Sequence, residues 1–517
     1  MDDRRKFDVI IIGAGVAGLT CGNYLARSGR KVLILEHGKN VGGNIQGMRR
    51  KGFFFDCGCQ STESVGILFP ILEELGIYDP SQWDRGTWRW VTPDCDVPLL
   101  DYEQIREDFK RCYPSSAKGI DRWFDFIVPG CRVMKGMMGE MPFPLVKRGA
   151  EKYRILARMS RVGMGFMPMV REALTLTGRE KALQLFDDRR LAFLFGEFGD
   201  PNMLLFMYFS FWYSFVNDYW YPQGGLKTLG EILADRFREQ GGEIVLQATV
   251  DRILTEGDRV VGVETVDEER YFADRVVNTG NPKRMVSQML DPALLPGKYS
   301  ENIRHAPVSY SMSTAFLGLD MDHEELLSRL KCTHTLYWRT YGFEDDNYDP
   351  EIHRKGMSMI TWCSMHDKTL APEGKNSLIV QVRTPYHWLN GWGTGSADPE
   401  VRTEEYRRLK ERVLDDIITD TEAVIPGLRE RLVFSDLATP RTLSRYTLNP
   451  EGSIMGWSYD RYRTPLYGRF ARFHTPVRGL YMAGHYAIWP GGVVFSALSG
   501  KIVAEGMYQG IARTLLW

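Results

Sequence analysis

The order of apolar and polar residues at the start of the chain predicts a strand, a helix and a second strand. The first strand candidate begins at Asp8, and the residues that follow it, 9–12 (VIII), form an unbroken apolar run typical of a strand buried on both faces. A helical stretch then continues to Ser28 and Gly29, and a second apolar strand ends on Glu36. This order predicts a βαβ unit with parallel strands.

Three glycines between the first strand and the helix have the spacing of a dinucleotide-binding turn. Gly13 permits the tight turn, Gly15 lets the backbone approach a pyrophosphate, and Gly18 lets the helix pack closely on the strand. The free N–H groups of the helix N-terminus favour phosphate. Glu36 follows where a carboxylate accepts hydrogen bonds from ribose hydroxyls and repels a 2′-phosphate. We therefore expect a cofactor with an adenosine diphosphate moiety that lacks that phosphate.

Two more glycines, Gly42 and Gly43, follow the second strand. A second close approach of the backbone at this place is more typical of FAD-binding folds than of NAD-dependent dehydrogenases, so the pattern favours FAD.

The sequence has no second GxGxxG unit, and we expect no separate pyridine-nucleotide domain. Electrons from NAD(P)H would have to arrive through the flavin site or from a separate donor. A quinone, oxygen or a redox partner are open alternatives.

Two further segments, 221–282 and 479–505, repeat features of a flavin-binding fold. The first predicts a helix, a strand that begins at Val250, a hairpin and a final short strand. The second predicts a short strand, a turn at Gly484, a glycine loop and a helix that carries small residues. Together these segments resemble the phytoene desaturase superfamily, which includes carotenoid desaturases, carotenoid cis-trans isomerases and retinol saturases. The flavin amine oxidases are similar at a greater distance.

The resemblance implies an α/β fold with a Rossmann-type FAD-binding domain of the flavin amine oxidase and phytoene desaturase kind, into which an α+β substrate domain is inserted. It implies that the backbone of Val250 holds the adenine. It also implies that the helix beginning at Gly492 points its positive end at the flavin pyrimidine ring. The residues implied to contact FAD are Gly13, Gly15, Gly18, Glu36, Gly42, Gly43, Asn44, Val250, Gly484, His485, Gly492 and Val493.

Two residues depart from the family pattern. His485 stands where an aspartate commonly contacts the flavin ribitol, and Asn44 stands where an arginine often follows the double glycine. An imidazole beside the flavin can donate a hydrogen bond to the ribitol or take part in proton transfer. We favour the first role and keep His485 as the catalytic candidate.

The substrate domain is expected to be discontinuous, because segments without a glycine fingerprint separate the flavin-binding segments. Strand-like runs that start at Val308, Gly356 and Asn376 predict a twisted sheet with one covered face, and a helical stretch over 402–423 follows. The predicted division is 1–82, 219–304 and 426–517 for the FAD-binding domain, 83–218 for a helical insertion with a candidate membrane-facing surface, and 305–425 for the substrate sheet and helix.

The earlier insertion is rich in methionine, aromatic and basic residues. Methionine-rich walls adapt to long flexible ligands, but at helical spacing such residues are equally typical of a core. The basic residues suit a helix face on anionic lipid, and a solvated helix face explains them nearly as well. The aromatic run covers 206–221, the methionines are Met134, Met137, Met138, Met141, Met159, Met164, Met167 and Met169, and the basic residues are Lys147, Arg148, Lys152, Arg154, Arg158 and Arg161.

Composition and charge exclude several classes of function. The 65 lysines and arginines balance 66 acidic residues, which argues against nucleic acid as a partner. Eight scattered cysteines indicate reduced thiols, and no metal site is expected, even at Cys57 and Cys59. The start of the chain lacks a secretion signal, and the apolar run 203–216 is shorter than the roughly 20 residues that span a bilayer. We expect a cytoplasmic protein with, at most, peripheral membrane contact, and leave its oligomeric state open.

The function implied by the resemblance is an FAD-dependent oxidoreductase. Its expected targets are carbon–carbon bonds of an apolar isoprenoid or polyene lipid, such as a carotenoid or retinoid, through desaturation, saturation or cis-trans isomerisation. FAD should be bound noncovalently, because no cysteine follows Cys363. The first alternative is an enzyme like the flavin amine oxidases that oxidises a C–N bond. The second is a non-catalytic module that carries a prenyl group.

Overall fold

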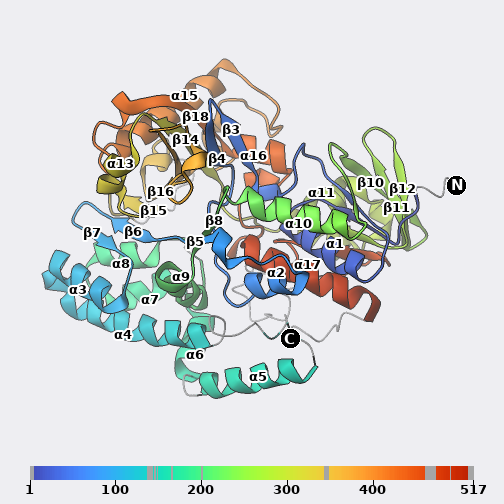
Figure 1. The fold of residues 1–517 in the computed structure, drawn as a ribbon, viewed down its shortest axis with the longest axis horizontal. Coiled ribbons are helices and arrows are strands. Elements are labelled where there is room, and N and C mark those ends of the chain that lie inside the picture. The colour runs from blue at the N-terminus through green and yellow to red at the C-terminus, as the bar shows by residue number, and fades with distance from the viewer. Residues whose placement is uncertain are drawn as a thin grey trace.

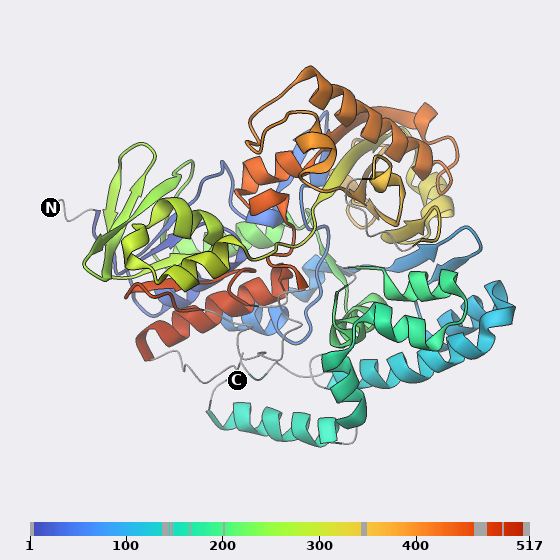
Figure 2. The same ribbon diagram turned by 180° about the vertical axis from the view of Figure 1, so that it is seen from behind.

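The computed structural model describes residues 5–136, 144, 147, 149–164, 167–199, 202–342, 349–459, 473–488 and 491–509. Figure 1 shows a nucleotide-binding part at the right, a mixed sheet with its helices at the upper left, and a group of helices at the lower left. The view from behind in Figure 2 shows the same three parts. The α/β fold class expected from the sequence is confirmed.

A five-stranded parallel sheet forms the centre of the nucleotide-binding part. Its order is β19-β13-β1-β2-β9. The predicted βαβ unit is present, with the first strand beginning at Val9 and Glu36 following the second. The strands are β1 (Val9–Ile12), β2 (Val32–Leu35), β9 (Glu243–Val245), β13 (Val276–Asn278) and β19 (Leu480–Met482). The sheet therefore joins segments from the start, middle and end of the chain.

Helix α1 (Val16–Arg27) packs between two helices that lie far from it in sequence, α10 (Lys227–Glu239) and α17 (Gly492–Gln509). Gly22 of α1 lies against the ring of Phe237 in α10. Gly500 of α17 lies against the backbone of Ala17 in α1. The small residues expected on the C-terminal helix thus let two helix backbones approach each other.

A three-stranded antiparallel sheet is inserted in the chain between β9 and β13 of the central sheet. It consists of β10 (Val250–Glu256), β11 (Arg259–Thr265) and β12 (Arg270–Phe272), and the turn between the first two includes Gly257 with φ of +57°. This is the hairpin that the sequence predicted. It places Val250 at the start of a strand, next to the central sheet.

The substrate part contains a seven-stranded mixed sheet with the order β18-β14-β17-β16-β15-β6-β7. Both insertions contribute to it, because β6 pairs in parallel with β15. The predicted boundary at residue 425 divides this sheet, since β18 lies beyond it. The strands are β6 (Trp88–Val91), β7 (Asp96–Pro98), β14 (Met312–Leu319), β15 (His334–Trp338), β16 (Met357–Trp362), β17 (Asn376–Arg383) and β18 (Leu432–Ala438).

The expectation that this sheet has one covered face is wrong, because all eight residues of β14 are buried. Helices α13 (His323–Leu330) and α15 (Glu404–Thr421) cover one face with Leu326, Leu330, Leu409 and Val413. The hairpin of β3 (Gly47–Arg50) and β4 (Phe53–Asp56) covers the other with Phe53 and Phe55. This hairpin belongs to the nucleotide-binding segment, so it links the two parts.

The helical part holds the aromatic run, and this run is core. Helix α9 buries Trp212, whose ring packs on Trp90 and Phe195 with centroids 5.1 and 5.9 Å apart. Met134 is also buried, whereas Met137, Met138 and Met141 lie outside the described residues. The helices are α3 (Tyr102–Cys112), α4 (Ala117–Met134), α5 (Gly149–Met164), α6 (Met167–Thr175), α7 (Gly178–Leu185), α8 (Arg189–Gly196) and α9 (Leu205–Asn217). Within the described parts of the chain, no helix is long and apolar enough to cross a bilayer.

Candidate functional site

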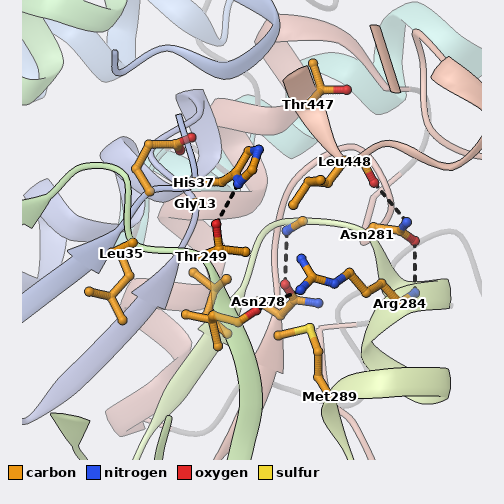
Figure 3. Close-up of a pocket in the computed structure, with 15 residues that line it drawn as sticks. Gly13, Leu35, His37, Thr249, Asn278, Asn281, Arg284, Met289, Thr447 and Leu448 are labelled. Carbon is orange, nitrogen blue, oxygen red and sulfur yellow. Dashed lines mark hydrogen bonds between the residues drawn. The ribbon is translucent and has the colours of Figure 1, made fainter. Parts of the chain in front are cut away.

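One pocket brings together three of the residues predicted to hold the adenosine end of the cofactor, Gly13, Glu36 and Val250 (Figure 3). Glu36 is only 8% exposed. Its carboxylate accepts hydrogen bonds from the backbone N–H of Ala14 and of Gly38, both at 2.6 Å. These two bonds fix its orientation and leave acceptor capacity for ribose hydroxyls.

The same pocket contains polar groups that the sequence analysis did not single out. Asn278 ends β13, and its side-chain Nδ2 is buried without a hydrogen-bond partner among the residues that the structure describes. Arg284 donates from Nη2 to the carbonyl of Val250 at 3.2 Å, which leaves that carbonyl a second lone pair. A buried amide donor without a partner costs free energy unless a ligand accepts from it. Its position at the carboxyl end of a central strand, where ligands bind in such sheets, is the sequence signal that could have identified Asn278.

The glycine loops lie directly against each other beside this pocket. The N–H of Gly42 donates to the carbonyl of Ala14 at 2.8 Å, and a Cβ on Gly43 would lie 3.2 Å from the Cα of Gly15. Both loop glycines have positive φ, +112° at Gly42 and +58° at Gly43. A Cβ on Gly18 would lie 2.0 Å from the carbonyl oxygen of Gly13, so only glycine fits there.

Helix α1 begins beside this pocket without a capping side chain. Its N-cap is Gly15, which offers no side-chain cap, and its first turn has no acidic residue. The first N–H groups of a helix lack partners within the helix, and they attract anions. A Cβ on Gly15 would meet only Gly43, at 4.0 Å, so the structure leaves room beside this glycine. This arrangement fits a pyrophosphate.

The C-terminal signature lies at the same end of α1. Gly484 follows β19 with φ of +88°, its N–H donates to Ser499 Oγ at 2.7 Å, and a Cβ there would lie 3.6 Å from Cβ of Ala17. Helix α17 then begins at Gly492, with Val493 buried behind it. We call the Val250 pocket, the glycine loops, the Gly484 turn and the start of α17 together the cofactor path.

Asn44 contributes its backbone to the site. Its carbonyl accepts from the N–H of Cys59 at 2.8 Å, and a Cβ on Gly58 would lie 2.3 Å from that oxygen. The loop after β4 is thus tied to the Gly42–Asn44 turn. The sequence analysis did not predict this contact, because it depends on how the β3–β4 hairpin folds back.

His485 is held tightly within its turn. A Cβ on Gly456 would lie 2.4 Å from the His485 carbonyl oxygen, and one on Gly491 would lie 3.2 Å from its Cβ. Its ring meets the edge of Tyr486 at 4.4 Å between centroids. Burial disfavours the imidazolium and lowers the pKa of His485 to about 4. The imidazole is therefore neutral at physiological pH, with one N–H to donate.

We predict that His485→Asn changes turnover by less than about tenfold, since an amide also donates a hydrogen bond, and weakens FAD modestly. A group that transfers the proton would instead cost about 10²-fold or more. Turnover and flavin content of the variant should be measured from pH 5 to 9, with the exposed His387→Asn as the control. A large rate loss at full flavin occupancy would make His485 a catalytic residue.

The residues present fit FAD. The unpartnered Asn278 Nδ2, the uncapped start of α1 and the close approach of the Gly15 and Gly43 backbones each leave a group or a space that this cofactor would satisfy. When bound, the flavin supplies hydride exchange. The protein's share is to bind the dinucleotide, to orient it and to keep water away from it.

A possible metal-binding cluster lies elsewhere, on the far side of the mixed sheet. It consists of Glu351, His353 and Asp416. Arg412 already pairs with Glu351 at 2.6 Å and with Asp416 at 3.6 Å. His353 Nε2 lies 2.8 Å from Asp416 Oδ2. Because these carboxylates already have cationic partners, the cluster is explained as a structural ion-pair network.

Comparison with known proteins shows what the chain is similar to. The chain is 25% identical to the all-trans-retinol 13,14-reductase of Danio rerio over 93% of this chain and 82% of that protein. It is 24% identical to the chloroplastic prolycopene isomerase of Daucus carota over 97% of this chain and 80% of that protein. Among solved structures, a putrescine oxidase triple mutant has 15% identity and a TM-score of 0.64, covering 98% and 99% of the two chains.

The family comparison covers nearly the whole chain. The model for the flavin containing amine oxidoreductases matches residues 16–507, from the start of α1 into α17. This range includes every segment of the cofactor path except β1 and its turn. The named relatives also bear out the resemblance to the phytoene desaturase superfamily. The chain belongs to the flavin containing amine oxidoreductase family and is an FAD-dependent oxidoreductase.

Proposed function

We propose that this enzyme acts on carbon–carbon bonds of an apolar polyene or isoprenoid lipid. The observation that carries the proposal is its similarity, over nearly its full length, to a retinol 13,14-reductase and a prolycopene isomerase. Both relatives are named for reactions at the double bonds of a conjugated chain. In such a substrate, charge that develops during the reaction can spread along the conjugated double bonds, so the protein needs few polar catalytic groups.

Oxidation of an amine is the second candidate, because the family description includes amine oxidoreductases. The similarity to putrescine oxidase is at 15% identity, which supports a shared fold only. We favour the polyene substrate, because the polyene enzymes are more similar in sequence across the same span. NAD(P)H or a quinone is proposed as the external redox partner.

The test is a flavin half-reaction. The purified protein is photoreduced without oxygen and then mixed with retinoids, carotenoids, quinones or amines, while the flavin absorbance is followed. We expect a retinoid or carotenoid to reoxidise the flavin, or to reduce it in the reverse experiment with oxidised enzyme. Reduction of the flavin by amines alone would overturn the proposal. Unfolding the same sample should release all the flavin, as expected of noncovalent FAD.

We also propose a cytoplasmic protein with peripheral contact to anionic lipid through α5. This helix lies at the edge of the molecule in both views (Figures 1 and 2). It exposes Tyr153, at 72%, and Leu156 next to Arg154, Arg158 and Arg161. Apolar side chains beside basic ones suit the headgroup region of an anionic bilayer. Sedimentation with vesicles that contain phosphatidylserine, but not with pure phosphatidylcholine vesicles, would support this contact.

A further inference from the structure

The loop between β4 and helix α2 (Leu68–Leu75) runs from the cofactor path to the substrate sheet. Cys59 joins it to the cofactor turn through Asn44. Ser61 Oγ lies 2.9 Å from Nε2 of His334 in β15, and Thr62 exchanges backbone hydrogen bonds of 3.0 and 2.8 Å with Trp220. Each of these positions is fixed by a different element.

The end of this loop is strained and is held in place by Asp218. Val65 has φ of +40°, which is costly for a β-branched residue. The Asp218 carboxylate accepts from the N–H of Val65 at 2.6 Å and of Ser64 at 3.2 Å. Its other oxygen accepts from Trp220 Nε1 at 2.7 Å. Strain of this kind persists where the surrounding structure requires one conformation, and it is frequent at active sites.

Glu63 lies between these fixed positions, and within the described part of the chain its carboxylate has no side-chain partner. Among the described residues, only the backbone N–H of Glu63 itself interacts favourably with that carboxylate. The titratable groups that face it are Cys59, Asp218 and Tyr219, and none of them is a cation. Desolvation, with a smaller contribution from the charge of Asp218, raises the pKa of Glu63 to about 7.

Glu63 as a residue is nevertheless only half-buried. A desolvated carboxyl without a partner, on a residue that is only half-buried, is available to a bound molecule. Two other deeply placed carboxyls with a raised pKa differ in this respect. Asp56 accepts from Tyr221 Oη at 2.6 Å and from the Leu226 N–H at 2.9 Å, and Asp218 accepts from the N–H groups of Ser64 and Val65. Both are thus committed to the structure, whereas Glu63 is free to act on a ligand.

The surroundings of Glu63 connect it with the flavin end of the site. Tyr219 interacts electrostatically with both Glu63 and Tyr310. The backbone of Tyr310 accepts from the Ile454 N–H at 3.3 Å. Gly456 follows Ile454 by two residues, and a Cβ on Gly456 would lie 2.4 Å from the carbonyl oxygen of His485. Tyr310 is therefore tied to the turn before α17, and Tyr219 is a neighbour of both Tyr310 and Glu63.

We propose that Glu63 is the proton-exchanging carboxyl of this enzyme, held on the strained 57–66 loop so that it passes a proton to or from the substrate. This inference rests on the proposed function. In reduction of a C=C bond, one carbon gains a hydride and its neighbour gains a proton. The flavin, when bound and reduced, would supply the hydride; the Glu63 carboxyl supplies the proton and is then reprotonated from solvent. Desaturation is the reverse, with the Glu63 carboxylate accepting the proton. A carboxyl that is half neutral near the working pH suits both directions.

The first arm of the test needs no substrate. Because the folded state holds the proton of Glu63 more tightly than the unfolded chain, whose Glu pKa is about 4.3, the wild type should lose stability as pH rises from about 4 to 8. In Glu63→Gln this loss should be smaller. Infrared difference spectra between pH 5 and 9 should lose one protonated-carboxyl band in the same variant. An unchanged spectrum and an unchanged pH dependence of melting would overturn the assignment.

The second arm measures turnover. Glu63→Gln should lower kcat by about 10²-fold or more at full flavin occupancy, with little change in KM, and should remove the pH limb near 7. Glu63→Asp should retain that limb at a reduced rate. The control Asp56→Asn should keep the limb, and its flavin content shows whether it folds.

Two outcomes separate this inference from the proposed function. If the wild type turns over a polyene and Glu63→Gln stays within tenfold of it, Glu63 is not the proton donor and the proposed function stands. If the wild type turns over no polyene, the proposed function fails and the proton transfer to substrate fails with it.

Discussion

Replacing Glu36 with arginine is expected to abolish tight FAD binding. The carboxylate of Glu36 accepts from two backbone N–H groups, of Ala14 and Gly38, and faces the pocket that Val250 lines. Arginine brings donors only, so both N–H groups lose their acceptor and the ribose hydroxyls lose theirs. Unpaired buried polar groups cost about 2 to 4 kcal/mol here, which corresponds to a loss of roughly 30- to 1,000-fold in affinity.

The measurement is the flavin content of the purified variant and a titration of the apoprotein with FAD. Glu36→Gln is the matched control, because it keeps one acceptor oxygen and the size of the side chain. We expect it to weaken FAD less than the arginine does. Unchanged flavin occupancy in Glu36→Arg would mean that the carboxylate of Glu36 only supports the glycine turn and does not touch the ribose.

Glu36 also shows which part of the site a sequence can predict. The residues from Gly13 to Glu36 lie within one βαβ unit, where local spacing alone fixes which groups meet. The predicted turn and carboxylate are therefore found together. The C-terminal glycines were placed by their resemblance to a known family, and one of them, Gly484, lies against Ala17 in the first turn of α1.

The sheet of the substrate part was harder to predict, for a physical reason. A strand buried on both faces and a strand covered on one face differ only in what packs against them. Here the second face is covered by Phe53 and Phe55, which lie more than 250 residues before β14 in the chain. The predicted boundary at 425 failed in a similar way, because pairing between β14 and β18 is nonlocal.

Glu63 was not predicted at all. Nothing in the local run QSTES distinguishes this glutamate from one on the surface. Its raised pKa comes first from desolvation and then from the charge of Asp218, which lies about 155 residues later in the chain. An acid acquires an unusual pKa through its surroundings, and those surroundings exist only after the insertion has folded.

Gly500→Ala is expected to destabilise the protein and to weaken FAD in the same step. A Cβ at this position would lie 2.3 Å from the carbonyl oxygen of Ala17 and 3.0 Å from the N–H nitrogen of Cys21. These atoms belong to consecutive turns of α1, so the added methyl group presses on the first turn of the helix. Overpacking of this kind costs about 1 to 3 kcal/mol or more, against a gain of at most about 1 kcal/mol from the helix propensity of alanine.

The consequence for FAD follows from where the strain falls. The first turn of α1 carries the N–H groups that would bind the pyrophosphate, and their geometry depends on the close approach of Gly15 and Gly43. Moving Ala17 shifts those groups and also Gly484, which lies against it. Thermal unfolding with and without added FAD separates the two effects, because a ligand that still binds well raises the melting temperature.

The matched control is Gly297→Ala, at the first position of helix α12 (Gly297–Arg304), where a Cβ would meet nothing within 4 Å. There the same substitution should leave stability unchanged or slightly increase it, and should leave FAD affinity as it is. If Gly500→Ala lowered the melting temperature but kept full FAD affinity, α17 would support the fold without setting the pyrophosphate site. If it changed neither, α1 and α17 would have to be further apart than the contact between Gly500 and Ala17 requires.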